Sequence, residues 1–263
     1  MRDGRLGTPF GTGRLLRCLA TLLAGLGMTA AQAQSLEEIQ WLSEEYAPFN
    51  FSDDGIPAGI SVEILTEMWD RLGLEQDATD IRILPWARGY RIAQDDPTAC
   101  LFATTVTEPR RELFTFVEPL FDVRIAIIGA GEGAPEINSI ADLESFQIGV
   151  VRDDIGEHLL EIAGAESPLV RTDSARIMMR MLRGGRFDLV AYDADVARWT
   201  MREEGMDPAD YADLLVLDET VMGIACHRDM DDSLIAQLQD ALDGVIDDGT
   251  AAEIIERYRP QDG

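Results

Sequence analysis

The stretch Phe187-Asp188-Leu189-Val190-Ala191-Tyr192, followed by Asp193, is typical of a buried strand. Its apolar residues are nearly continuous, which suits a strand covered on both faces, as in a parallel sheet. In such sheets, ligands bind beyond the carboxyl ends of the strands. The first polar residue after this strand, Asp193, is therefore a candidate binding residue.

Short apolar runs and helical periodicity alternate on both sides of this strand. Further strands are predicted at residues 39–42, 81–84, 99–103, 121–128, 148–151, 214–217 and 223–226, and one near 169–170. Helices are predicted at 60–72, 88–94, 139–146, 155–163, 174–183, 196–204 and 233–246, with a last one opened by a capping box at 250–253. Residues 43–59 are predicted to form a loop. The alternation predicts an α/β fold with mostly parallel sheet.

One predicted helix carries a specific prediction about its buried face. In the helix at 155–163, the inward positions are expected to be Ile155, Leu159, Ile162 and Ala163.

Polar and aromatic side chains gather just after the predicted strands, where a ligand would bind. They are Tyr46, Trp86, Arg88, Thr105, Arg110, Arg152 and Asp193. If the strand predictions hold, these residues converge on one edge of the sheet.

The composition excludes several classes of function. The 263 residues carry 49 acidic and 22 basic side chains, a net charge of −27, and every basic residue is arginine. Such a chain is a poor ligand for nucleic acid or an anionic membrane, so no nucleic-acid partner is expected. His158 and His227 are isolated, and the sequence has no nucleophile elbow and no metal-binding loop. We therefore expect a protein that is not an enzyme and needs no cofactor or metal.

The first 33 residues have the parts of a secretory signal peptide. Arg14 and Arg17 precede an apolar stretch at 19–28, which leads to Ala31-Gln32-Ala33. The apolar stretch is too short for a membrane span. We expect cleavage after about Ala33 and export to the periplasm.

Two cysteines follow the predicted signal peptide, Cys100 and Cys226. Neither lies in a metal-binding or redox motif. We expect two buried free thiols, with a single disulfide as the alternative that an oxidising compartment permits.

Several short motifs resemble the extracellular solute-binding protein family 3. Each motif is weak alone, but their order and spacing over residues 36–259 are specific. They are Glu45-Tyr46-Ala47-Pro48-Phe49-Asn50-Phe51, Gly59-Ile60-Ser61-Val62-Glu63-Ile64-Leu65, Pro85-Trp86-Ala87-Arg88, Thr107-Glu108-Pro109-Arg110-Arg111, Phe116 with Pro119, Ile148-Gly149-Val150-Val151, Phe187-Asp188-Leu189-Val190, Gly223-Ile224-Ala225 and Asp248-Gly249-Thr250.

The resemblance implies a two-lobed periplasmic-binding-protein fold of type II, a clamshell whose lobes each hold a mostly parallel sheet flanked by helices. Lobe 1 would comprise residues 34–121 and 222–263, and lobe 2 residues 122–221. Two strands would form the hinge, near 120–124 and 218–222. The resemblance also places Cys100 and Cys226 on neighbouring strands, where a disulfide could form.

The resemblance further implies roles for the candidate residues. Arg110 would clamp a ligand carboxylate, with Thr105 adding a hydroxyl, and Asp193 would hold an ammonium group. Tyr46 and Trp86 would wall the pocket. Arg152 would face the ligand's side chain, and Gly156 would allow a close backbone approach at a helix start. Arg88, in the Pro85-Trp86-Ala87-Arg88 motif, is a further candidate for ligand binding.

One motif departs from the family pattern. Asp153-Asp154 replaces the usual Ser/Thr-Gly pair before Gly156, and two acids there would repel an anionic group.

The implied function is that of a monomeric protein that closes around a small amino-acid-like solute and presents it to an ABC permease. Two alternatives remain open. One is a periplasmic sensing subunit for a membrane signalling partner. The other is a dehydratase on the same fold that uses Asp153 or Asp154.

Overall fold

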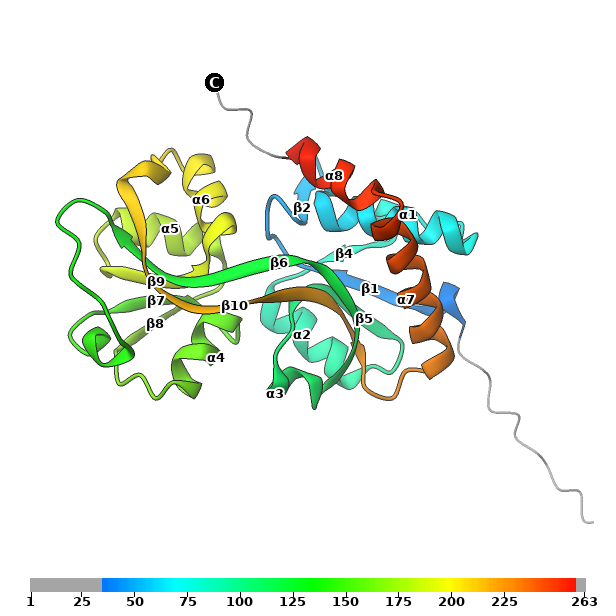
Figure 1. The fold of residues 1–263 in the computed structure, drawn as a ribbon, viewed down its shortest axis with the longest axis horizontal. Coiled ribbons are helices and arrows are strands. Elements are labelled where there is room, and N and C mark those ends of the chain that lie inside the picture. Colours follow the sequence, from blue (N-terminus) through cyan, green and yellow to red (C-terminus); the bar gives the residue numbers. More distant parts are fainter. Residues whose placement is uncertain (1–34, 259–263) are drawn as a thin grey trace, which may run out of the picture. The chain divides into compact units, whose positions relative to one another are not determined.

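The computed structural model describes residues 35–258, so the predicted signal peptide lies outside the described residues. The fold is mixed α/β, with helices on both sides of a central sheet (Figure 1).

The strands are β1 (Gln40–Ser43), β2 (Phe51–Asp53), β3 (Ile56–Ala58), β4 (Arg82–Ile83), β5 (Ala99–Thr105), β6 (Phe114–Ala130), β7 (Ile148–Val151), β8 (Leu169–Thr172), β9 (Leu189–Asp193) and β10 (Tyr211–His227). The α-helices are α1 (Ile60–Leu72), α2 (Trp86–Asp95), α3 (Glu108–Arg111), α4 (Ile155–Ile162), α5 (Ala175–Arg183), α6 (Ala194–Glu203), α7 (Asp232–Asp247) and α8 (Thr250–Tyr258). Short 3-10 helices lie at Leu36–Glu38, Ala78–Asp80, Ile140–Leu143 and Pro208–Asp210.

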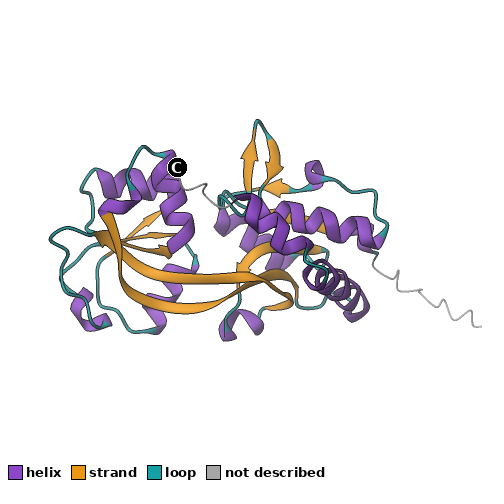
Figure 2. Ribbon diagram, turned by 45° about the horizontal axis from the view of Figure 1, so that its top comes forward, coloured by secondary structure: helices purple, strands orange, loops and turns teal. Residues whose placement is uncertain are grey.

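The strands β6 and β10 run side by side through both lobes (Figure 2). Each has 17 residues, and they pair antiparallel from Tyr211 opposite Ala130 to His227 opposite Phe114. The sequence predicted shorter strands here, and it broke β10 in two around Asp218. Register shifts between Asp213 and Leu215 and between Val216 and Asp218 account for this, because a bulge interrupts the alternation without ending the strand.

The sheet joins two lobes into one eight-stranded order, β4-β1-β5-β10-β6-β9-β7-β8. β1 pairs parallel with β4 and β5, and β7 pairs parallel with β8 and β9. The two long strands pair antiparallel with their neighbours β5 and β9. This confirms the predicted two-lobed α/β fold and shows that the lobes share a single sheet.

The helix α1 illustrates how the sequence pattern becomes packing. Its predicted apolar face is buried, and Trp69 packs edge-on against Trp41 of β1, with ring centroids 5.5 Å apart. The helix ends at Gly73, which adopts the left-handed conformation (φ 69°) that favours glycine. The helices α7 and α8 contact α1 on the same side of the sheet (Figure 1).

The predicted inward face of α4 is correct at Ile155 and wrong at Ile162 and Ala163, which are exposed. Ile162 is 67% exposed, and the buried positions are Ile155, Gly156, Glu157 and Leu160. Glu157 takes an inward position because its carboxylate accepts hydrogen bonds from the Asp153 amide and from the Arg171 side chain.

Three smaller predictions also differ from the structure. Residues 43–59, predicted as a loop, contain the β2–β3 hairpin. The helix predicted at 139–146 is only a 3-10 turn, Ile140–Leu143. The last helix does not use a capping box at Thr250, because Thr250 is already helical and Asp248 accepts the hydrogen bond from its amide, 3.1 Å away.

Cys100 and Cys226 form a disulfide, so the expectation of two free thiols is wrong. The two residues lie directly opposite each other in the antiparallel pairing of β5 and β10, with their Cα atoms 4.0 Å apart. Close opposite pairs of this kind occur where residues face each other without exchanging hydrogen bonds. The pairing of strands 126 residues apart could not be read from local sequence.

We therefore expect the exported protein, denatured without reductant, to show no reactive thiol, and two after reduction. Closing a loop of this length stabilises the fold by on the order of 4 kcal/mol in the chain-entropy account, so the double variant Cys100→Ala with Cys226→Ala should melt at a lower temperature. Thiol titration and thermal unfolding measure both effects. Two reactive thiols before reduction would contradict the disulfide.

Candidate functional site

Arg110 is the central cation of the candidate site. It lies on the short helix α3, whose first turn is capped by the Thr107 hydroxyl. The side chain is buried, and Nη1 donates a hydrogen bond to the carbonyl oxygen of Thr105, 3.0 Å away. Nη2 is also buried and has no hydrogen-bond partner within the described residues. A buried guanidinium with an unused donor can bind an anionic group such as a carboxylate.

Two aromatic rings of α2 flank the Arg110 guanidinium. Its Cζ lies 5.2 Å from the centroid of the Trp86 ring and 5.5 Å from that of Tyr90. Trp86 and Tyr90 are four residues apart on one helix face, which brings their rings to 5.4 Å. Both contacts are in the range of cation–π attraction, so the two rings help to hold the guanidinium in place.

Trp86 also connects the two lobes. Its indole Nε1 donates a hydrogen bond to the carbonyl oxygen of Asp153, 2.7 Å away, on the loop between β7 and α4. Asp153 adopts a left-handed backbone (φ 57°), which aspartate tolerates better than most residues. This backbone therefore brings the start of α4 to the aromatic pair.

Three carboxyl groups are buried around these residues. Glu44 follows β1, and its carbonyl oxygen is held by the Asn50 side chain at 2.8 Å. Asp154 caps α4 by accepting a hydrogen bond from Ile155 N, and its Oδ2 has no partner among the described residues. Asp193 ends β9 and caps α6, its Oδ1 accepting hydrogen bonds from the Asp195 and Val196 amides at 3.0 and 2.9 Å.

Burial raises the pKa of all three carboxyl groups. For Glu44, the pKa is raised further by the negative charge of Asp154 and lowered by Arg110. The pKa of Asp154 is also raised by burial, against the opposing effect of Arg110. Burial raises the pKa of Asp193 to about 7, although its capping hydrogen bonds favour the ionised form. For Asp154 and Asp193, the cost of removing the charged carboxylate from water therefore exceeds the stabilisation that the helix start provides.

Two tyrosines complete the cluster. The rings of Tyr46 and Tyr192 meet edge-on with centroids 5.6 Å apart, and both are buried. The Tyr46 hydroxyl has no partner among the described residues. Burial raises the pKa of Tyr46 well above its usual value, and the charges of Asp193, Asp154 and Glu44 raise it further, so this hydroxyl stays protonated near all three carboxyls.

Gly156 lies in the first turn of α4, and packing against β9 explains why a glycine is there. A Cβ at this position would overlap the carbonyl group of Ala191. The absence of a side chain lets α4 approach the carboxyl end of β9, so that Asp154 and Asp193 lie at the same edge of the sheet.

The structure brings Tyr46, Trp86, Thr105, Arg110, Gly156 and Asp193 to the region between the lobes, and it leaves two predicted residues outside. Arg88 is exposed on α2. Arg152 is exposed and pairs with Asp173, with Nε 3.7 Å from Oδ1. Thr105 contributes its carbonyl oxygen to Arg110, where a hydroxyl contact with the ligand was predicted.

Glu44, Tyr90, Asp154 and Tyr192 were not among the predicted site residues. The spacing of Tyr90 from Trp86 and the position of Glu44 just after a strand were visible in the sequence. Asp154 was noticed as a departure from a motif and as a possible acid of the dehydratase alternative, and Tyr192 only as part of its strand.

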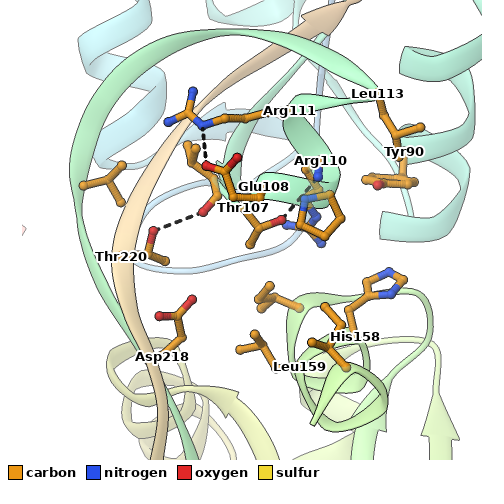
Figure 3. Close-up of a pocket in the computed structure, with 15 residues that line it drawn as sticks. Tyr90, Thr107, Glu108, Arg110, Arg111, Leu113, His158, Leu159, Asp218 and Thr220 are labelled. Atoms are coloured by element: carbon orange, nitrogen blue, oxygen red, sulfur yellow. Dashed lines mark hydrogen bonds and ion pairs between the residues drawn. The ribbon is translucent and has the colours of Figure 1, made fainter. Parts of the chain in front are cut away.

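A cavity of about 430 Å³ borders the cluster at Arg110 and Tyr90. Figure 3 shows His158 and Leu159 of α4 below it and α3 above it, with Thr220 and Asp218 of β10 at the left. Its lining is mostly apolar, and its size suits a small organic ligand.

Metal binding and membrane insertion find no support in the part of the chain that the structure describes. Over residues 35–258, no three His, Cys, Asp or Glu side chains are placed to hold a metal ion. No helix in the same range is long and apolar enough to cross a membrane.

Residues 41–261 match the bacterial extracellular solute-binding proteins, family 3, and the chain belongs to this family. No curated protein matches the sequence. Solved structures share the fold at low identity. One is a histidine kinase sensor domain with similarity to periplasmic binding proteins (TM-score 0.75, 21% identity, 84% of this chain and 95% of that chain). Another is an ancestral arginine-binding protein bound to arginine (TM-score 0.72, 22% identity, 86% of this chain and 100% of that chain). A third is the substrate binding protein of an amino acid ABC transporter (TM-score 0.70, 16% identity, 85% of this chain and 99% of that chain).

The raised pKa of Asp193 predicts an unusual pH dependence of stability. Between about pH 4 and 7 the folded state keeps this proton, whereas the unfolded chain has released it, so the free energy of unfolding falls as the pH rises through this interval. From pH 5 to 8 Asp193 alone should contribute a loss of about 3 kcal/mol. Asparagine can still cap α6, so Asp193→Asn should remove most of this loss in urea unfolding.

Asp77→Asn is the matched control. Asp77 also caps a helix through its side chain, but it is exposed and its pKa is lowered, so this variant should keep the full loss between pH 5 and 8. An equal pH dependence in Asp193→Asn and the parent protein would refute the prediction.

Proposed function

We propose that the protein binds a small amino-acid-like solute between its two lobes and presents it to an ABC permease. The observation that carries this proposal is the buried Arg110 guanidinium, which packs against both Trp86 and Tyr90 and keeps Nη2 unpaired in the described structure. Leaving a buried charged donor unpaired is costly, and a ligand carboxylate would supply the missing partner.

In this proposal, Asp193 pairs with the α-ammonium group of the ligand. Its carboxyl group is buried at the end of β9, and a ligand ammonium group would favour its ionised form. The rings of Tyr46 and Trp86 would cover the ligand's apolar atoms. In this proposal Arg88 and Arg152 contribute no contact to the bound ligand, since both side chains are exposed.

The lobes would move about the middle of the two long strands. In the proposed division, lobe 1 is 34–121 plus 222–263 and lobe 2 is 122–221, so the crossing points lie where Phe121 pairs with Met222 and Asp122 with Val221. Delivery to a permease implies a periplasmic location, with the signal peptide removed after about Ala33, and a monomer as the working form.

Sensing is a second candidate function. It is favoured by the likeness to the histidine kinase sensor domain, in which the same fold serves signalling. Co-purification of the exported protein with either a permease or a sensor kinase from its own membranes would separate the two roles.

We also propose that the protein is not an enzyme, because His158, the histidine that attracts Asp154, contacts the backbone carbonyl oxygen of Asp153 and, within the described residues, no carboxylate. Incubation with prephenate or arogenate should therefore yield no product. Product formation would overturn this part of the proposal.

The test of ligand binding starts with a thermal-shift screen of the twenty L-amino acids, opines and small carboxylates, followed by calorimetry on each ligand found. Arg110→Ala should weaken binding by about 2–4 kcal/mol, because it removes a charge-assisted contact to the ligand carboxylate. Arg111→Ala is the matched control, since Arg111 is a half-exposed neighbour that pairs with Glu118.

A loss of less than about threefold in Arg110→Ala, or an equal loss in Arg111→Ala, would contradict the role of Arg110. If no compound in the screen raises the melting temperature or binds in calorimetry, the proposal of an amino-acid-like ligand is wrong.

A further inference from the structure

The candidate site holds more buried carboxyl groups than an ordinary amino acid can pair with. Glu44, Asp154 and Asp193 are 8%, 4% and 1% exposed, and Arg110 is 3% exposed. None of the three carboxyls forms an ion pair within 4.0 Å in the described structure. A zwitterionic ligand would use Arg110 for its carboxylate and Asp193 for its ammonium group, which leaves Glu44 and Asp154 without a cation.

The groups facing these two carboxyls do not supply that cation. Arg110 attracts both, and His158 on α4 attracts Asp154, but the neighbouring Glu45 and Glu157 repel them. Asp154 also repels Glu44 across the space between the lobes. Once Arg110 is paired with a ligand, its charge is shared with the ligand carboxylate, and the two acids face each other with less compensation.

Several buried polar atoms of the candidate site have no partner among the described residues. Asp154 Oδ2, the Tyr46 hydroxyl and Arg110 Nη2 are all buried and have no hydrogen-bond partner within residues 35–258. They come from three different elements on both lobes, the start of α4, the turn after β1, and α3. A folded protein rarely leaves several such atoms unsatisfied unless something else completes them.

We expect the cation that pairs with Glu44 and Asp154 to be an organic group of the ligand. Within the described residues no group of three acidic, histidine or cysteine side chains has the geometry to hold a metal ion. An ammonium or guanidinium group has several donors and can pair with two carboxylates that approach from different sides.

We propose that Glu44 and Asp154 select a ligand that carries a second positive charge, on its side chain, in addition to its α-ammonium group. This inference rests on the proposed function, because it assumes that Arg110 and Asp193 hold the amino-acid end. The ligand class is an α-amino acid with an amine or guanidine side chain.

The test compares ligands that differ only in this charge. L-Arginine and L-citrulline have nearly the same shape, but the citrulline side chain is neutral. Calorimetry on the exported protein should give at least roughly thirtyfold tighter binding for L-arginine or L-lysine than for L-citrulline, with no binding of L-glutamate.

Two variants locate the preference. Glu44→Gln and Asp154→Asn each remove one charge, and asparagine can still cap α4. Each should lower the preference for the cationic ligand by at least roughly tenfold, while binding of L-citrulline stays the same or improves. If one variant fails to fold, as judged by its melting transition, the other decides.

Matched controls come from the adjacent residues. Glu45 and Asp153 are exposed neighbours of the two acids, so Glu45→Gln and Asp153→Asn change the net charge equally and should keep the preference. An equal loss of preference in these controls would assign it to overall charge and overturn the inference.

The remaining outcomes separate this inference from the proposed function. If neutral or acidic amino acids bind as tightly as L-arginine and L-lysine, the inference is wrong while the proposed function stands. If no amino acid binds, the proposed function fails and this inference fails with it.

Discussion

The continuous pairing of β6 with β10 holds the molecule together. These two strands are the innermost members of the sheet, and every other strand of the eight is attached on one side or the other of this pair. The backbone hydrogen bonds of the ladder are shared by both lobes, so the lobes cannot slide apart without breaking it. Bending or twisting of this two-stranded ribbon would keep the ladder intact, and the proposed closure of the lobes needs a motion of this kind.

The raised pKa values of Asp154 and Asp193 follow from their burial at or just beyond the ends of strands. Carboxyls at helix starts are ordinarily stabilised in the ionised form by the helix dipole and by capping hydrogen bonds. Asp154 and Asp193 have both advantages, yet burial still raises the pKa of each. When desolvation outweighs capping, the ionised form of these acids is unfavourable, and a bound cation would stabilise it.

The sequence was a reliable guide where the chain repeats a local pattern. The helix α1 and the strand β9 were visible from periodicity and from a continuous apolar run, and the family motifs led to Arg110, Trp86 and Asp193. Periodicity failed at α4, because Glu157 is buried through its hydrogen bonds to Asp153 and Arg171, and an apolar-face argument cannot anticipate such contacts. Local patterns did not predict the disulfide, and only the family resemblance placed Cys100 and Cys226 on neighbouring strands. The interaction of Glu44 with Asp154 joins segments far apart in the sequence, which local patterns cannot bring together.

The sheet order also bears on when the molecule can assemble. β5 ends at Thr105, but its neighbour β10 begins only at Tyr211 and pairs with β5 from Met222 to Cys226. The first lobe is thus built from both ends of the chain, while β7, β8 and β9 come from one uninterrupted segment. Contacts between segments far apart in sequence form late, because long loops must close first. The lobe that contains β7, β8 and β9 can therefore fold before the chain is complete. The sheet of the first lobe forms only once β10 has been made.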